Sequence, residues 1–137
     1  MIVEFRACLS DPTNIVANMG VRTIEVPYGA YLIHAYYKAG ATPSVWELKT
    51  QVGETVSRVP TRLRGDKVYH VFRIEAMENM AILYIDGARM AETRTNVPSS
   101  VYEITMSVRN TARVERVLYV DYVWALQTRS ADAMAGF

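Results

Sequence analysis

The sequence predicts an all-β protein, an antiparallel β-sandwich or barrel, and three observations lead to this fold class. Apolar and polar residues alternate with a period of two over short runs, and turn residues separate the runs. No segment has the apolar periodicity of an amphipathic helix of three turns. The chain has 137 residues, of which 50% are hydrophobic, enough for one domain with its own core. We expect this domain over residues 1–127, followed by a tail over 128–137.

The first four expected strands are separated by residues that favour turns. We expect strands over 3–9, 15–21, 31–38 and 45–51. Turns are expected at 10–14, 27–29 and 39–43, which contain Pro, Gly, Asn or Asp. The run 31–38 is apolar on both faces, which is typical of a central strand. In 45–51 the alternation places Trp46, Leu48 and Thr50 on one face.

The second half shows clearer alternation after an irregular stretch. Residues 52–67 contain Gly53, Pro60 and Gly65, which predict a long connection with room for one short strand. Further strands are expected over 68–76, 81–86, 89–95, 101–109 and 117–127. The pair Asp86-Gly87 predicts a tight hairpin between two of them. The alternation predicts mostly buried side chains at Phe72, Ile74, Leu83, Ile104, Met106, Val120 and Tyr122.

Four segments of the second half occur in an order that is typical of one family. They are Tyr69-His-Val-Phe-Arg-Ile-Glu75, Ala81-Ile-Leu-Tyr-Ile-Asp-Gly87, Thr95-Asn-Val-Pro98 and Leu118-Tyr-Val-Asp-Tyr-Val-Trp124. Over residues 44–127 the chain resembles the concanavalin A-like jelly roll of laminarinase-type glycoside hydrolases and their non-catalytic, lectin-like relatives. The resemblance implies a jelly-roll β-sandwich of two antiparallel sheets.

The resemblance also implies what catalysis would need, because family enzymes hydrolyse β-glucans with two carboxylates that alternate along one strand. Retaining hydrolysis needs a nucleophile and an acid about 5 Å apart, and residues at i+2 and i+4 share one face of a strand. None of the 14 acidic residues has another acidic residue at either offset. Glu75 and Glu78 are three apart and would lie on either side of a turn. We therefore expect no catalytic residues and no enzymatic activity.

His34 and His70 are the only histidines, and neither stands in a motif for nucleophilic catalysis or zinc binding. His70 matches a family position that packs and forms hydrogen bonds between the sheets, so we interpret it as a core histidine. The resemblance makes Asp121 a candidate ligand for a structural calcium ion. The alternative, which we prefer, is that Asp121 forms hydrogen bonds to a neighbouring loop. We expect no metal and no cofactor.

Composition speaks against several classes of partner. Lys plus Arg is 15 and Asp plus Glu is 14, with no basic half or tail, so we expect no nucleic acid. No stretch is long and apolar enough for a membrane span. Cys8 is the only cysteine, so an intrachain disulfide is impossible. The N-terminus carries Glu4 and Arg6 where a signal peptide has an apolar run, so we expect a protein made in the host cytoplasm.

Two function classes remain, and we favour the first. In this class the chain is a virion structural protein, specifically a bacteriophage capsid decoration (cement) protein that coats or stabilises the particle. Compact sandwiches without enzyme residues recur among such proteins. The partner would be the major capsid protein or another virion protein, and the chain would act as a homo-oligomer or in many copies. We expect the contacts at Arg62, Arg64, Met134 and Phe137.

The second class is a carbohydrate-binding, lectin-like module, which could stand on a phage tail or fibre. Aromatic side chains exposed on a concave sheet can stack on sugars. Trp46 and Tyr37 are the candidates, and Trp46 comes first because its strand alternates cleanly. The tripeptide Arg64-Gly65-Asp66 spells the integrin-recognition motif, but a match of three residues often arises by chance.

Overall fold

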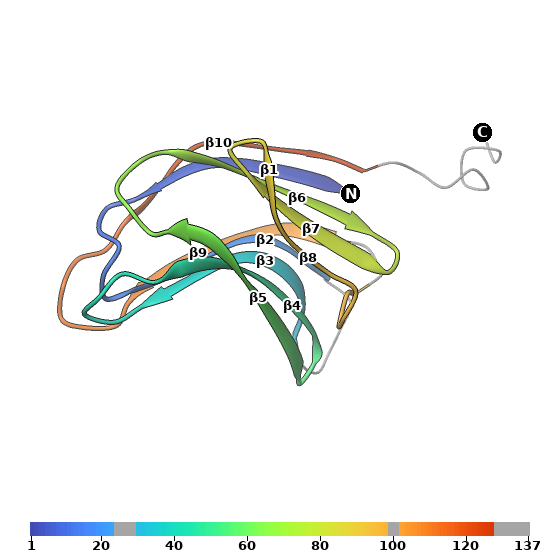
Figure 1. Cartoon of the computed structure of the whole chain (residues 1–137), viewed down its shortest axis with the longest axis horizontal. Helices are drawn as coiled ribbons and strands as arrows, with labels where there is room; N and C mark the ends of the chain where they lie inside the picture. The colour runs from blue at the N-terminus through green and yellow to red at the C-terminus, as the bar shows by residue number, and fades with distance from the viewer. Residues whose placement is uncertain (24–29, 99–101, 128–137) are drawn as a thin grey trace.

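A computed structural model describes residues 1–23, 30–98 and 102–127. These residues form two antiparallel sheets of five strands each, which confirms the predicted sandwich (Figure 1). The strands are β1 (Ile2–Leu9), β2 (Ile15–Thr23), β3 (Ala30–Ala39), β4 (Val45–Gly53), β5 (Thr55–Arg64), β6 (His70–Met77), β7 (Met80–Ile85), β8 (Ala88–Thr93), β9 (Tyr102–Asn110) and β10 (Leu118–Leu126). In the described ranges no helix is long and apolar enough to cross a membrane.

The strand order places β9 and β10 at one edge of the sandwich and β5 and β8 at the other. One sheet has the order β10-β1-β6-β7-β8 and the second has the order β5-β4-β3-β2-β9. Both curve in the same direction, and the free face of the second lies on the inside of the curve (Figure 1). We call the second the concave sheet, its free face the concave face, and the first the convex sheet. β3 is the middle strand of the concave sheet, as its apolar residues predicted.

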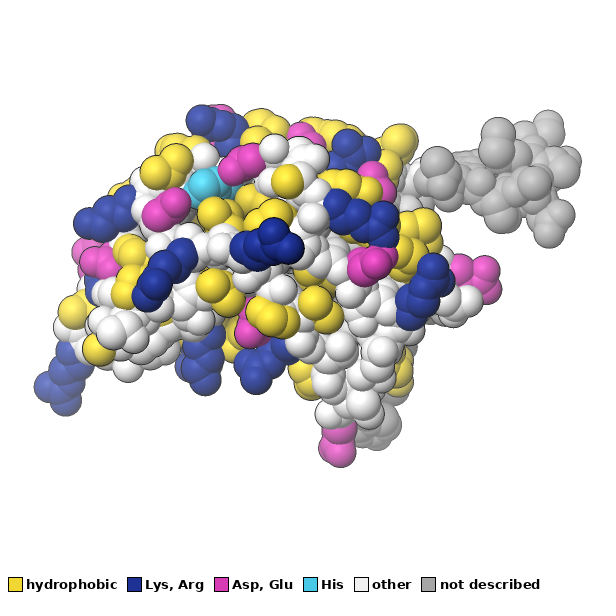
Figure 2. Space-filling view, viewed as in Figure 1, with side chains coloured by type: hydrophobic (Ala, Val, Ile, Leu, Met, Phe, Trp, Pro, Cys, Tyr) yellow, Lys and Arg dark blue, Asp and Glu magenta, His cyan; other side chains and the backbone are white. Residues whose placement is uncertain are grey.

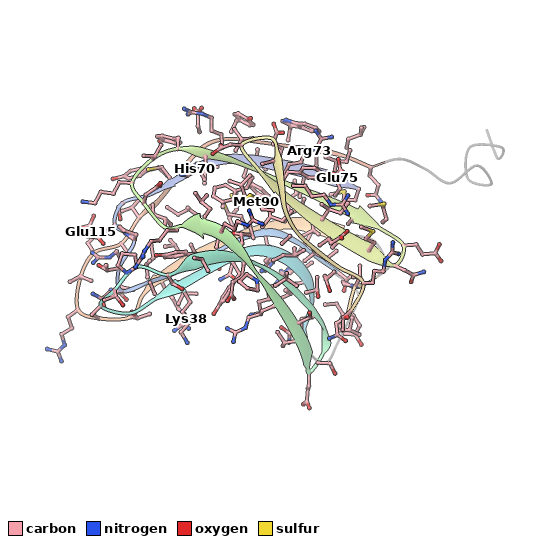
Figure 3. The ribbon with its side chains drawn as sticks, in the orientation of Figure 1. Lys38, His70, Arg73, Glu75, Met90 and Glu115 are labelled. Atoms are coloured by element: carbon pink, nitrogen blue, oxygen red, sulfur yellow. The ribbon has the colours of Figure 1, made fainter. Side chains whose placement is uncertain are left out.

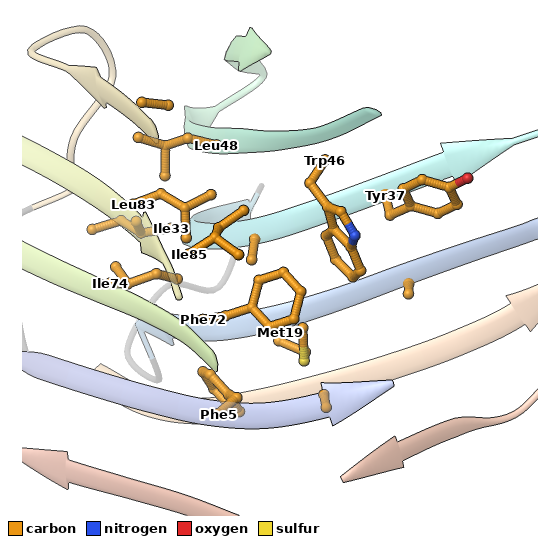
Figure 4. Packing of buried hydrophobic residues seen from close by; sticks show 14 of the residues in the cluster. Phe5, Met19, Ile33, Tyr37, Trp46, Leu48, Phe72, Ile74, Leu83 and Ile85 are labelled. Atoms are coloured by element: carbon orange, nitrogen blue, oxygen red, sulfur yellow. The ribbon is translucent and has the colours of Figure 1, made fainter. Parts of the chain in front are cut away.

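The core lies between the sheets and consists of the alternate residues that a period of two selects. Phe72, Ile74 and Leu83 are buried, as expected. Trp46 packs on Phe72 with ring centroids 4.4 Å apart and on Tyr37 with centroids 5.2 Å apart (Figure 4). Aromatic side chains from β3, β4 and β6 thus connect the two sheets through the core.

The expected burial of apolar residues on β9 and β10 is wrong. Ile104, Met106 and Val120 are 39%, 44% and 37% exposed, although the register places them beside buried residues of β2 and β1. β5 and β8 pack against each other at the opposite edge, whereas no comparable contact joins β9 and β10 in the described residues. For these three residues the alternation predicts the correct side of the strand, but the described residues provide no second layer to cover that side.

Tyr122 was also expected to be buried, and it is exposed because the register of β10 shifts. Ala7 pairs with Val120 and Arg6 pairs with Tyr122, so one extra residue, Asp121, lies between the two pairs. A bulge of this kind reverses the face on which the later side chains lie. Tyr122 and the alternate residues after it therefore point to the free face of the convex sheet.

The expected long connection over 52–67 is instead mostly strand β5. It pairs with β4 through a hairpin at Gly53, whose φ of 63° favours glycine. β5 is an edge strand, and an edge tolerates Pro60 because proline lacks the N–H that a central strand needs. Most side chains of β5 are exposed or half-buried. The segment therefore lacks the apolar alternation that identifies the other strands.

Candidate functional site

A hollow of about 840 Å³ lies at the β9 side of the concave sheet. The outward-facing residues here form three rows across β9, β2 and β3, which are Glu103, Arg22 and Leu32; Thr105, Gly20 and His34; and Ser107, Asn18 and Tyr36. Apart from Gly20, the residues of the first two rows line the hollow, together with Ser107. Charged, hydroxyl and imidazole groups thus gather on one side of the concave face.

His34 crosses β2 to reach β9. Its Nε2 lies 2.9 Å from the Thr105 hydroxyl, and its Nδ1 lies 3.4 Å from the Asn18 side-chain oxygen. A Cβ at Gly20 would come within 2.9 Å of the His34 Cα and Cδ2 and within 2.1 Å of the Ile33 carbonyl oxygen. The imidazole can therefore lie across β2 only because residue 20 has no side chain.

His34 is neutral at neutral pH. Burial, and then the positive charges of Lys49 and Arg22, lower its pKa from 6.5 to about 4. A neutral imidazole has one nitrogen that donates a hydrogen bond and one that accepts. With both nitrogens engaged, His34 fixes the orientation of the Thr105 hydroxyl and the Asn18 amide on the concave face.

Charged side chains lie within these rows and beside them. Arg22 and Glu103, both in the first row, form an ion pair. From β4 and β5, beyond the rows, the Lys49 Nζ lies 4.7 Å from the centre of the Tyr36 ring, and Arg58 covers the same ring. Tyr36 is consequently buried although it faces outward. Figure 2 shows basic side chains projecting below the concave side of the molecule.

Two acidic side chains that face outward on the concave sheet, Glu47 and Glu103, are too far apart to act together. Glu47 on β4 is three strands away from β9 and four residues further along the sheet than Glu103. This separation is on the order of 20 Å, given the usual strand spacing and rise. Glycosidases place their two carboxyl groups about 5 to 9.5 Å apart. These two residues therefore cannot serve as a glycosidase pair.

The two aromatic residues that we expected to stack on a sugar are both in the core. Trp46 is 2% exposed and Tyr37 is fully buried, so neither offers a stacking surface and that prediction is wrong. The Tyr37 hydroxyl donates to the Pro12 carbonyl oxygen at 2.5 Å and accepts from the Ser44 amide at 3.0 Å. The alternation of β4 places Trp46 on one face, but it does not reveal which face a second sheet covers.

Asp121, the calcium candidate, lies beside a cation. Its carboxylate accepts a hydrogen bond from the Arg6 Nη1 at 2.9 Å. No group of three or more potential metal ligands occurs within residues 1–23, 30–98 and 102–127. A guanidinium next to the carboxylate repels a metal ion. The structure therefore favours the hydrogen-bonding alternative, with a partner on strand β1 rather than on a loop.

His70 joins two turns at one end of the sandwich. Its Nδ1 lies 2.5 Å from the Asp86 carboxylate and its Nε2 lies 2.9 Å from the Asp66 carboxylate. Figure 3 labels His70, and Figure 2, in the same orientation, shows a histidine (cyan) at that place between acidic side chains (magenta). Burial alone would lower its pKa, but the hydrogen bonds and charges of Asp86 and Asp66 outweigh that effect and raise it. His70 is thus a hydrogen-bonded structural histidine, as interpreted from the sequence, but it is half-buried at the end of the sandwich rather than in the core.

The Arg64-Gly65-Asp66 tripeptide has a structural explanation. A Cβ at Gly65 would lie 2.3 Å from the Tyr37 ring, so the position requires glycine. Asp66 holds His70 and accepts a hydrogen bond from the Val68 amide at 3.1 Å. Packing and hydrogen bonding therefore account for the glycine and the aspartate without a role in cell adhesion.

The residues expected to contact a partner fall into two groups. Arg62 and Arg64 are exposed on β5, an edge strand of the concave sheet. Their side chains are therefore accessible from outside, and their role as partner contacts stays a prediction. Met134 and Phe137 lie outside the described residues.

A row of aromatic side chains on the convex sheet was not anticipated. The Tyr122 hydroxyl and the Trp124 Nε1 donate to the same Glu4 carboxylate oxygen at 2.8 and 2.9 Å. Trp124 is 42% exposed. The bulge in β10 turns these rings outward, and alternation alone does not reveal a bulge.

Comparison with known proteins bears on the fold. No family model matches the chain, and no curated protein matches it. Among solved structures, a beta-glucanase of Bacillus licheniformis aligns with a TM-score of 0.71 at 17% sequence identity, over 89% of this chain and 64% of the glucanase. The chain has the jelly-roll fold of a glucanase.

This likeness confirms the concanavalin A-like jelly roll that the four sequence segments predicted. The chain spans 64% of the length of the glucanase, and at 17% identity the likeness shows the fold alone. The expected absence of enzymatic activity therefore stays a prediction.

Proposed function

We propose that the protein is a carbohydrate-binding module that holds an oligosaccharide on its concave face and does not cleave it. The observation that carries the proposal is the gathering of Arg22, His34, Glu103 and Thr105 at a hollow of about 840 Å³. Small-molecule sites are concave, contain a few well-placed polar groups and measure about 300–1,000 Å³. The jelly-roll fold shared with a beta-glucanase supports the same class of ligand.

The side chains at the hollow suit a neutral ligand that is rich in hydroxyl groups. A sugar hydroxyl both donates and accepts hydrogen bonds. The Arg22 guanidinium offers only donors and the Glu103 carboxylate only acceptors, so the ion pair can bind hydroxyls in both roles. The Thr105 hydroxyl donates its one hydrogen to His34 Nε2, because Nδ1 donates to the Asn18 oxygen, so toward a sugar it is an acceptor. Because the charges of the ion pair cancel, a neutral sugar fits this site better than an anion.

Binding without cleavage follows from the spacing of the carboxylates. Glu47 and Glu103 lie on the order of 20 Å apart on the concave face. A retaining or an inverting mechanism needs a carboxyl pair within about 9.5 Å across the scissile bond. The outward-facing residues of the described strands therefore support a binding site rather than a hydrolytic one.

The proposal is tested by isothermal titration with a panel of soluble β-glucan oligosaccharides. We expect binding to the unaltered chain, and we expect Arg22→Met to abolish it by removing donors and leaving Glu103 unpaired. Arg89→Met is the matched control, because Arg89 forms a similarly exposed ion pair with Glu92 on β8 of the convex sheet. Arg89→Met should bind as the unaltered chain does.

Four outcomes would contradict the proposal. Binding to no member of the panel would remove the ligand class, and equal binding by Arg22→Met would remove the site. Loss of binding in Trp124→Ala, with Arg22→Met unaffected, would place the sugar on the aromatic row of the convex sheet. Release of reducing sugar that disappears in Glu103→Gln would show that the protein is an enzyme.

A second candidate function is a structural component of a virion, present in many copies and bound to the major capsid protein or another virion protein. The observation that favours it is the partly exposed inner face of β9 and β10, where apolar side chains are available for assembly. Mass spectrometry of purified particles from the source tests this candidate. Many copies per particle would support it, and absence from the particles would end it.

A further inference from the structure

We propose that two copies of the chain associate through β9, in an antiparallel pair centred on Met106 that joins their concave sheets into one. β9 is the edge strand of its sheet and is nine residues long. Within the described residues it pairs only with β2, so the backbone groups on its other side are free for another strand. Natural proteins usually protect such an edge with short strands, bulges or inward-pointing charges.

The sequence of β9 is self-complementary about Met106. In a two-fold antiparallel pair centred on this residue, positions equally far from Met106 face each other. Ile104 then faces Val108, Thr105 faces Ser107, and Glu103 faces Arg109. Apolar groups meet apolar groups, hydroxyls meet hydroxyls and opposite charges meet. Each of these cross-strand combinations stabilises a sheet.

The pair of opposite charges favours this register over registers that are shifted along the strand. A pair centred on Thr105 would place Glu103 opposite Ser107, and one centred on Ser107 would place Arg109 opposite Thr105. Only the centre at Met106 brings Glu103 and Arg109 together, and the two-fold axis forms this ion pair twice. β10, the other strand at this edge, offers no such pairing because Asp121 is its only charged residue.

Apolar surface provides the driving force. Ile104, Met106 and Val108 face inward by register and are 39%, 44% and 38% exposed. No charge interrupts this inward row, so the edge carries no inward-pointing charge against pairing. The two-fold pair brings two such rows side by side and removes part of their apolar surface from water. A second copy therefore fits both the charges and the exposed apolar side chains.

The pairing has a consequence for the concave face, which rests on the proposed function. Glu103, Thr105 and Ser107 line the hollow and lie on β9 itself. Joining two β9 strands places two hollows next to each other across one continuous sheet. The combined groove would suit a longer chain of sugar units than one copy can hold.

Sedimentation velocity of the full chain, without sugar, tests the association. We expect a dimer whose Kd rises at least about tenfold in Arg109→Glu, since two attractive charge pairs become repulsive. Glu103→Arg should weaken the dimer in the same way. An equimolar mixture of these two variants should form a heterodimer, because opposite charges then face each other again. Arg113→Glu, an equal charge change on an exposed loop residue, is the control and should dimerise normally.

Disulfide trapping tests the register. Residues directly opposite in an antiparallel pair have Cα atoms about 4.5–5.5 Å apart, which a disulfide can bridge. Under mild oxidation Met106→Cys should form a covalent dimer, because the two cysteines face each other. Ile104→Cys should not, because each residue 104 faces residue 108 of the second copy and the two cysteines are four residues apart along the strands. The native Cys8 is buried, and oxidation of the unaltered chain measures how much covalent dimer Cys8 forms by itself.

A monomer at all concentrations, unchanged dimerisation in Arg109→Glu, or equal cross-linking of Ile104→Cys would overturn the proposal. These measurements are independent of the proposed function, because none of them contains sugar. A dimer that binds no oligosaccharide would refute the proposed function and leave the β9 pairing intact.

Discussion

Acid should destabilise this protein through His34. The pKa of His34 is lowered from 6.5 to about 4 in the folded chain, mainly by burial. The unfolded chain therefore takes up a proton near pH 6.5 that the folded chain accepts only near pH 4. The stability contributed by neutral His34 is fully present above pH 6.5 and is lost as the pH falls toward 4. A difference of about 2.5 pH units corresponds to about 3 kcal/mol of unfolding free energy.

His70 acts with the opposite sign. Its pKa is raised in the folded chain, where Asp86 and Asp66 stabilise the charged ring. That contribution is present below pH 6.5 and is lost as the pH rises through the folded-state pKa. The unaltered chain shows the sum of both effects, so the two histidines must be changed one at a time.

Urea unfolding at pH 7.0, 5.5 and 4.5 separates the two histidines. We expect His34→Gln to reduce the loss of unfolding free energy between pH 7.0 and 4.5 by about 2 kcal/mol relative to the unaltered chain. His70→Gln should instead steepen that loss, because it removes a group that stabilises the fold in acid. The reasoning would be refuted if His34→Gln lost as much stability in acid as the unaltered chain does.

Two further predictions concern packing. Gly20→Ala should lower the unfolding free energy measured in urea by about 1–3 kcal/mol, because its Cβ would lie 2.1 Å from the Ile33 carbonyl oxygen. In the control Gly40→Ala the Cβ meets nothing within 4 Å, so stability should change little. Equal effects of the two variants would contradict the crossing of β2 by the imidazole. Trp46→Ala should lower the unfolding free energy by about 3–5 kcal/mol, as expected for a buried aromatic residue. Trp124→Ala should lower it far less, because Trp124 is half-exposed. The reversed order would contradict the bulge in β10.

Where a strand has no bulge, the sequence predicts which side of the strand a residue faces, but not whether a second layer covers that side. Ile74 and Met106 stand in the same alternating pattern, yet Ile74 is buried and Met106 is 44% exposed. The difference lies in the strand order, because β6 is central and β9 is an edge. The same rule explains β5, whose mostly exposed side chains carry no alternation and whose segment therefore resembles a loop in sequence.

The candidate site could not be found from the sequence, because its parts come together only through the register. His34 and Thr105 are 71 residues apart and meet across β2 because Gly20 stands between them in the same row. None of these residues belongs to a recognisable motif on its own. Trp46, by contrast, is easily recognised in the sequence as a residue that could stack on a sugar, but its side chain lies in the core.

Glu103 connects the two proposals physically. It pairs with Arg22 at the hollow, and in the β9 dimer it would also face the second copy's Arg109. A carboxylate held between two guanidinium groups is more firmly placed than one held by a single group, so association of two copies should order the acceptor that a sugar needs. Coupling between two binding events is reciprocal. If pairing through β9 strengthens sugar binding, then sugar must strengthen the pairing by the same factor, and the apparent sugar affinity must depend on protein concentration.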